Sequence, residues 1–233
     1  MSLNALFRRC LKSFLLHLPK IPQISIETSK TFQFIRVWNF LFAAKVRGDY
    51  LEFGVYRGES FILSLRISQK FFAPGQVGSP RFFAFDSFEG LPPLTPFKDD
   101  PEQFQKGEYS ASLDHFKKKV FRKFRKQTIH IVPGYYHESL TEKLYATYQL
   151  KNAAFVTIDC DLYESTYAAL AFITPLLITG SVLYFDDWYS NKGNMSLGEP
   201  RACSEWLLHH PDIRLIEYGN VGTMGKLFMV NRL

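Results

Sequence analysis

The chain has 233 residues, of which 46% are hydrophobic and 16% aromatic, so it can bury a sizeable core and disorder is excluded as its default state. Its net charge of +6 is concentrated in two local patches, which argues against the groove-length basic stripe of a nucleic-acid-binding protein. Three cysteines without metal-ligand spacing exclude a disulfide framework, and no apolar run reaches the roughly eighteen residues of a membrane span. We therefore expect a cytoplasmic protein.

Residues 1–47 are predicted to form an N-terminal helical segment. Residues 1–20 place basic and apolar side chains at helical spacing, and they lack a small-residue cleavage site, so we do not expect a signal peptide. Residues 31–44 repeat apolar positions every three or four residues, which predicts a second helix that covers the following domain. Three roles fit the first helix: a lid, an arm of a homodimer, and a membrane-surface helix, of which membrane contact is the least favoured.

Residues 48–233 alternate strand and helix patterns up to about residue 210. Strands are predicted at residues 49–55, 81–86, 128–132, 153–159, 181–185, 213–218 and 226–230. Helices are predicted at residues 57–69, 111–126, 138–148, 164–177 and 200–209. The last two strands are expected to form an antiparallel pair. The order predicts an α/β fold with a mostly parallel, seven-stranded sheet and helices on both faces.

A glycine-containing turn, Glu-Phe-Gly-Val-Tyr-Arg-Gly at residues 52–58, joins the first predicted strand to its helix. Gly54 and Gly58 allow a tight turn and a close approach of backbone to a ligand at the helix N-terminus. The spacing is not the G-x-G-x-x-G dinucleotide fingerprint. The preceding acid, Glu52, suits a ligand with a positive amino or sulfonium group better than a pyrophosphate. A merely structural turn is an equally good interpretation of this motif alone.

Asp86 ends the second predicted strand. In a Rossmann-like sheet an acid at this position accepts hydrogen bonds from both hydroxyls of a ribose, although a turn or helix-capping aspartate is the alternative. Gly134 follows the third predicted strand, where it can flank an adenine. His137, nearby, is more typical of a loop histidine than of a catalyst.

A long polar loop at residues 89–108 contains four prolines, and a loop of this length in a compact domain is typically a lid or a binding loop. The helix that follows carries Phe116, Val120 and Phe124 on one stripe. The seven positive charges of residues 117–126 lie on its other face, which indicates a solvated helix surface.

Two neighbouring apolar strands end in paired aspartates, Asp159 with Asp161 and Asp186 with Asp187. The carboxyl ends of parallel strands meet at one edge of the sheet, so we expect the four carboxylates to lie close together. They would repel one another unless a cation or shared protons neutralised them. Neither stretch contains a lysine or arginine, so a divalent metal ion is the economical interpretation.

With these motifs in view, the chain resembles the macrocin O-methyltransferase family from about residue 50 to residue 188. The resemblance rests on LEFGVYRG, on FDSFEGLP, on Gly107-Glu-Tyr, and above all on IDCDLYEST followed by FDDW. Members of this family are S-adenosylmethionine-dependent and magnesium-dependent enzymes that methylate sugar hydroxyls on antibiotics. The resemblance implies a Rossmann-like class I methyltransferase domain at residues 48–233.

The resemblance also implies roles for individual residues. Asp159, Asp186 and Asp187 would bind Mg²⁺, and Asp161 would be the general base. Because the D-x-D spacing places Asp161 on the same strand face as Asp159, Asp161 could bind the metal as well. The cofactor, S-adenosylmethionine, would be bound by Glu52, Gly54, Tyr56, Gly58, Ser60, Asp86, Ser87 and Gly134, with its ribose at Asp86.

The sequence therefore predicts an S-adenosylmethionine-dependent, divalent-metal-dependent O-methyltransferase (a transferase of EC 2.1.1 type) acting on a hydroxyl of a small glycoside or polyol. The alternative is a non-catalytic module of the same fold that only binds the cofactor, but the four intact aspartates argue against it. Nucleic-acid methylation through residues 117–126 ranks low, because at least two of the three adjacent phenylalanines fit the buried stripe. A small-molecule acceptor and no nucleic acid are the expected partners.

Overall fold

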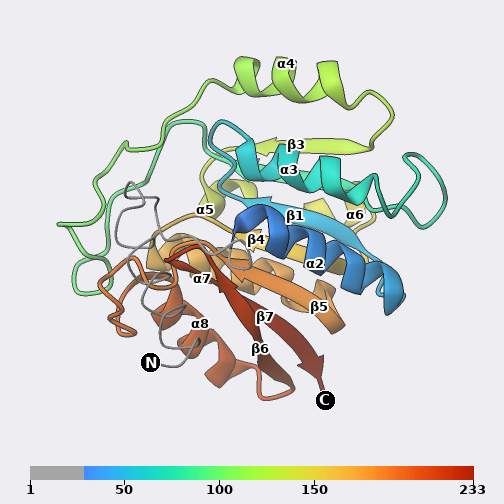
Figure 1. The fold of residues 1–233 in the computed structure, drawn as a ribbon. Coiled ribbons are helices and arrows are strands. Elements are labelled where there is room, and N and C mark those ends of the chain that lie inside the picture. The colour runs from blue at the N-terminus through green and yellow to red at the C-terminus, as the bar shows by residue number, and fades with distance from the viewer. Residues whose placement is uncertain (1–28) are drawn as a thin grey trace, which may run out of the picture.

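The computed structural model describes residues 29–233, and the helix expected at residues 1–20 lies outside the described residues. A single seven-stranded sheet has the order β3-β2-β1-β4-β5-β7-β6 (Figure 1). Strands β1 to β5 are parallel, and β7 runs antiparallel to both β5 and β6. The strands are β1 (Asp49–Phe53), β2 (Phe82–Asp86), β3 (Ile129–Pro133), β4 (Ala153–Ile158), β5 (Leu177–Phe185), β6 (Ile213–Val221) and β7 (Gly225–Arg232). The predicted fold class and the closing antiparallel pair are confirmed.

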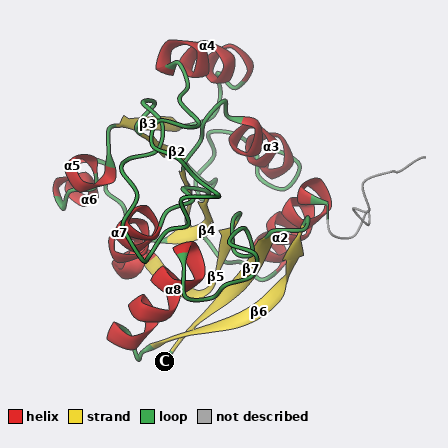
Figure 2. Cartoon of the chain, turned by 90° about the vertical axis from the view of Figure 1, so that its left-hand side faces the viewer, coloured by secondary structure: helices red, strands yellow, loops and turns green. Residues whose placement is uncertain are grey.

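Helices cover both faces of the sheet, as Figure 2 shows. One face packs against α2 (Lys30–Ala43), α3 (Glu59–Ser68) and α4 (Leu113–Lys123). The other packs against α5 (Tyr136–Ser139), α6 (Lys143–Thr147), α7 (Tyr163–Ile173), the short 3₁₀ helix η2 (Thr174–Leu176) and α8 (Gly198–His209). The helix predicted at residues 31–44 is confirmed as α2. The predicted stripe of Phe116, Val120 and Phe124 is buried against the sheet.

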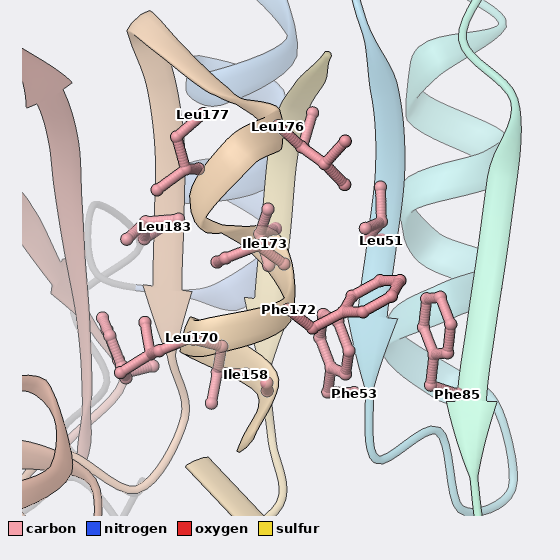
Figure 3. Packing of buried hydrophobic residues seen from close by; sticks show 14 of the residues in the cluster. Leu51, Phe53, Phe85, Ile158, Leu170, Phe172, Ile173, Leu176, Leu177 and Leu183 are labelled. Atoms are coloured by element: carbon pink, nitrogen blue, oxygen red, sulfur yellow. The ribbon is translucent and has the colours of Figure 1, made fainter. Parts of the chain in front are cut away.

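The central strands are buried on both faces because their apolar residues are continuous rather than alternating. On the α7 side, the rings of Phe53 and Phe85 stack at 4.6 Å between centroids, and Phe172 of α7 packs edge-on against both (Figure 3). The two apolar faces hold the strands in the register that brings their carboxyl ends together.

The prediction of a single helix at residues 138–148 is wrong, because two short helices, α5 and α6, occupy this region. The hydroxyl of Ser139 donates to the carbonyl of Gly134, and the N–H of Thr141 donates to the carbonyl of Ser139. A serine side chain bonded to a nearby carbonyl competes with helical bonding, and the backbone leaves the helix at Leu140.

Strand β5 begins at Leu177, earlier than predicted, and runs through Gly180. A glycine inside a strand often marks a close approach of another segment. At Gly180 a Cβ atom would lie 2.7 Å from Cγ2 of Val46, and the backbone has a φ of +91°. Gly180 therefore lies inside β5, where the absence of a side chain leaves room for Val46, and the predicted strand start at residue 181 is too late.

The long loop is folded onto the domain. Its ends are joined by backbone hydrogen bonds from Leu91 to Glu108 and from Gly107 to Leu91, each of 2.9 Å. Inside it, the buried carboxylate of Asp99 accepts from the N–H of Thr95 and from the N–H of Tyr163, the first residue of α7. The loop is thus a wall anchored to a helix N-terminus. Among residues 29–233, no helix is long and apolar enough to cross a membrane.

We expect Phe172→Ala to lower the free energy of unfolding by about 3–5 kcal/mol, because it leaves a cavity between α7 and the sheet. Phe172 is 5% exposed, and its ring stacks on Tyr145 as well. Phe121→Ala on α4 is the matched control; this residue is 44% exposed, and the change should stay within about 0.5 kcal/mol. Urea unfolding of both variants measures the difference, and equal losses would contradict this packing.

Candidate active site

A cavity of about 730 Å³ lies at the carboxyl ends of the parallel strands. Its wall combines the turn after β1, the residues after β2, the segment after β3, and the ends of β4 and β5. The first residue of α2, the first turns of α3 and α7, the start of the long loop, and Tyr109 just after that loop complete it. This is the edge at which ligands bind in open α/β sheets.

The three predicted metal ligands meet in this cavity. Asp159, Asp186 and Asp187 each offer a carboxylate oxygen, and these oxygens all lie within 4.8 Å of one another. Burial, together with the negative charge of Asp186, raises the pKa of Asp159 well above its usual range, and burial also raises the pKa of Asp187. A cluster of oxygen donors whose charges repel one another fits Mg²⁺, which prefers such ligands.

Backbone hydrogen bonds hold the cluster together. The N–H of Asp186 donates to the carbonyl of Ile158 at 3.0 Å, and the N–H of Asp159 donates to the carbonyl of Phe53 at 2.8 Å. At Gly54, with a φ of +85°, a Cβ atom would lie 1.7 Å from the carbonyl oxygen of Asp159. Only glycine fits where the turn after β1 crosses the end of β4.

Asp161 lines the cavity but is not on the strand. β4 ends at Ile158, and Asp161 adopts a left-handed backbone with a φ of +62°, so the expectation that Asp159 and Asp161 share a strand face is wrong. A tight turn from Cys160 to Leu162 redirects the chain. Burial, and then the charge of Asp187, raises the pKa of Asp161 well above its usual range. The two carboxyl groups are also hydrogen-bonded to each other.

Glu52 does not line the cavity; it is fully buried beneath the turn after β1. Its Oε1 accepts from the hydroxyl of Ser60 at 2.6 Å, and its Oε2 accepts from the hydroxyl of Tyr50. Burial raises the pKa of Glu52 to about 7, and the hydrogen bonds from Ser60 and Tyr50 oppose this rise. Ser60 does line the cavity, so Glu52 acts on that wall through Ser60.

The carboxylate of Asp86 lines the cavity and braces the turn after β1. Its Oδ2 accepts from the N–H groups of Val55 and Tyr56, both at 2.8 Å, and its Oδ1 accepts from the N–H of Phe88 at 2.7 Å. These are the bonds of a turn aspartate, the alternative that the sequence left open beside ribose binding. Three backbone donors hold the carboxylate in place.

The other expected cofactor-binding residues divide into two groups. Gly54, Tyr56, Ser60 and Ser87 line the cavity. Gly58 and Gly134 lie behind it: Gly58 precedes α3 and faces the ring of Phe116, and the N–H of Gly134 donates to the carbonyl of Asp86. The residues after Gly134, Tyr135 to His137, form the wall at that end.

Lys30 and Glu199 were missed by the sequence analysis, and Tyr109 was given no role in it. The Nζ of Lys30 lies 3.0 Å from both carboxylate oxygens of Asp186, and a lysine at the start of a covering helix carries no local signal. Glu199, fully buried in the first turn of α8, accepts from the N–H of Asp187 at 3.0 Å. Its other oxygen has no hydrogen-bond partner among the described residues. The ring of Tyr109 stands edge-on to that of Tyr56 at 5.9 Å; only its place in the Gly107-Glu-Tyr motif pointed to it.

Comparisons with known proteins agree with this geometry. The model of the family described as Macrocin-O-methyltransferase (TylF) matches residues 19–200. Demethyldecarbamoylnovobiocin O-methyltransferase of Streptomyces niveus is 27% identical over 155 residues, which are 61% of this chain and 53% of that protein. The chain thus spans about half the length of this curated relative.

Two solved structures share the fold. The O-methyltransferase NovP superposes with a TM-score of 0.66 at 20% identity, covering 86% of this chain and 78% of its own. CalS11, a calicheamicin methyltransferase, superposes with a TM-score of 0.67 at 21% identity, covering 98% of this chain and 93% of its own. The fold is therefore the Rossmann-like fold of methyltransferases.

The raised pKa of Glu52 predicts how stability depends on pH. Unfolded glutamate titrates near 4.5, and folded Glu52 near 7, so the folded protein holds this proton more tightly. Its contribution to stability is complete below about pH 4.5 and is lost as the pH rises through about 7. Between pH 5 and pH 8, wild type should lose about 2–3 kcal/mol relative to Glu52→Gln. Urea unfolding of both proteins at the two pH values measures this, and a constant gap between them would refute it.

Proposed function

The chain belongs to the macrocin O-methyltransferase family, and from that premise we propose that it transfers a methyl group from S-adenosylmethionine to a hydroxyl of a small glycoside or polyol, with Mg²⁺ at the aspartates. Residues 48–233 would form the methyltransferase domain. The observation that carries the proposal is that Asp159, Asp186 and Asp187 converge in the same cavity as the turn after β1.

The cavity wall offers suitable contacts for the cofactor. The turn at Gly54 and Tyr56, with Ser60 beside it, would bind the methionine end, since all three residues line the cavity. Ser87 and the wall formed by Tyr135 and Tyr136 would receive the nucleoside. When bound, S-adenosylmethionine supplies an electrophilic methyl group on a sulfonium centre.

Asp161 is suited to take the proton of the acceptor hydroxyl. Its raised pKa makes it a stronger base than an ordinary aspartate, and it lies beside the metal ligand Asp187. S-adenosylmethionine would supply the methyl group to the hydroxyl oxygen and keep the electron pair of the broken carbon–sulfur bond on sulfur, and a carboxylate oxygen of Asp161 would take the proton. A divalent cation on Asp159, Asp186 and Asp187 would supply Lewis acidity that lowers the hydroxyl pKa.

The relatives support a sugar hydroxyl as acceptor. CalS11 is described as a TDP-rhamnose 3′-O-methyltransferase. The enzyme from Streptomyces niveus methylates, by its name, demethyldecarbamoylnovobiocin. The cavity has polar and aromatic groups for such a molecule near the proposed base, because Tyr109, Glu164 and Ser165 line it together with Asp161.

We expect Asp159→Asn to remove Mg²⁺ binding and metal-dependent turnover while changing cofactor affinity, measured without Mg²⁺, by less than about threefold, because Asp159 belongs to the metal cluster and not to the turn after β1. Isothermal titration with Mg²⁺ and with S-adenosylmethionine measures the two affinities separately. Transfer of labelled methyl groups to a panel of glycosides measures turnover.

Asp114→Asn is the matched control, because Asp114 is exposed in the first turn of α4. It should behave as wild type in every assay. The proposal fails if wild type does not bind S-adenosylmethionine, or if Asp159→Asn retains Mg²⁺ binding at the wild-type level. Cofactor binding by wild type without Mg²⁺ binding or methyl transfer would instead indicate the non-catalytic module.

A further inference from the structure

Lys30 joins two parts of the cavity that the proposed function uses separately. It is the first residue of α2, and it lies 156 positions before Asp186 in the sequence. Its Nζ lies 3.0 Å from each oxygen of the Asp186 carboxylate, and it lies 5.4 Å from the centroid of the Tyr184 ring. The hydroxyl of Tyr184 donates to the same carboxylate. The carboxylate of Asp186 is therefore held by the ammonium group of Lys30 and by the hydroxyl group of Tyr184.

Positive charge is scarce in this cavity. Among the described residues that line it, the lysine and arginine side chains are Lys30 and Arg57, against seven carboxylates: Glu59, Asp86, Asp159, Asp161, Glu164, Asp186 and Asp187. Arg57 is exposed, and its guanidinium stacks over the ring of Tyr56. Lys30 is thus the cation placed among the carboxylates.

Lys30 also lies within electrostatic reach of the turn after β1. Burial lowers the pKa of Lys30, but the negative charges of Asp186, Asp159 and Glu52 more than offset this and raise it. Glu52 is hydrogen-bonded to Ser60, which lines the wall where the methionine end of the cofactor is proposed to bind. Lys30 lines the same cavity as the metal ligands and that wall.

The proposed ligands would change what this ammonium group must neutralise. A divalent cation at the aspartates would take over the negative charge of Asp186. The amino acid moiety of the cofactor has one ammonium and one carboxylate group; the acidic side of the turn suits the ammonium, and the carboxylate needs a cation. The lysine side chain is long and flexible, and its pairing with Asp186 is partly exposed (35% and 28%), so exchanging partners costs little.

Building on the proposed function, we propose that Lys30 couples metal binding to cofactor binding. Without metal its ammonium group neutralises Asp186, and with a divalent cation on the aspartates it binds the carboxylate of the cofactor's amino acid moiety. Metal and cofactor then strengthen each other's binding, and by thermodynamic reciprocity the factor is the same in both directions. Lys30 is a binding and positioning residue in this scheme and takes no part in proton transfer.

Two probes isolate this interaction. S-adenosylhomocysteine carries the amino acid moiety without the sulfonium charge, whereas 5′-methylthioadenosine lacks the amino acid moiety. Isothermal titration of the full chain with each probe, with and without Mg²⁺, is carried out on wild type, Lys30→Met and Lys30→Arg. In wild type, Mg²⁺ should tighten S-adenosylhomocysteine by about tenfold, a typical coupling, and leave 5′-methylthioadenosine unchanged.

Lys30→Met should abolish this coupling, weaken S-adenosylhomocysteine by about tenfold in Mg²⁺, and leave 5′-methylthioadenosine unchanged. It should also bind Mg²⁺ more tightly in the absence of cofactor, because no ammonium group competes for Asp186. Lys30→Arg keeps the charge and should retain part of the coupling. Lys143→Met, at the exposed first residue of α6, is the matched control and should match wild type.

The outcomes separate the two proposals. If wild type binds neither probe, the proposed function fails and this inference fails with it. If wild type binds both probes but Lys30→Met changes their affinities equally, or changes neither, the inference alone is overturned. Mg²⁺ affinity that is unchanged or weaker in Lys30→Met, without cofactor, would overturn it as well.

Discussion

Repulsion between carboxylates at the carboxyl ends of β4 and β5 is the constraint on which the rest of the structure depends. Strand pairing places Asp159 and Asp186 side by side, and burial together with the charge of Asp186 raises the pKa of Asp159. The fold counters this with Lys30 from α2, whose ammonium group pairs with Asp186. Under the proposed function, a divalent cation on Asp159, Asp186 and Asp187 would neutralise the same charges.

Hydrogen bonds of neighbouring polar side chains support this cluster and the turn beside it. Glu199 accepts from the N–H of Asp187, and the hydroxyl of Ser190 donates to the carboxylate of Asp187. Asp86 braces the turn after β1, and Glu52 anchors Ser60 from below. Burying so many acids lowers stability unless each is hydrogen-bonded. The aromatic layers on both faces of the sheet offset this cost and keep the polar groups in register.

Part of the cavity wall is formed by the long loop at residues 89–108. Its neck is closed by backbone hydrogen bonds at Leu91, and its buried Asp99 caps α7, the helix that begins just beyond Asp161. The position of Tyr109 therefore depends on the same contacts that position the proposed base. A loop that the sequence shows only as long and proline-rich thus becomes part of the geometry of the site.

The sequence by itself determined the order of strands and helices, the paired aspartates at the strand ends and the glycine turn, because each depends on contiguous residues and on the period of their apolar positions. It also pointed to the family. Tertiary structure alone decided that Lys30 contacts Asp186 and that Glu199 supports Asp187. It also decided that Glu52 is buried below the cavity and that Asp161 lies in a turn beyond β4. These arrangements join residues far apart in the chain or depend on where a strand stops, and packing decides both.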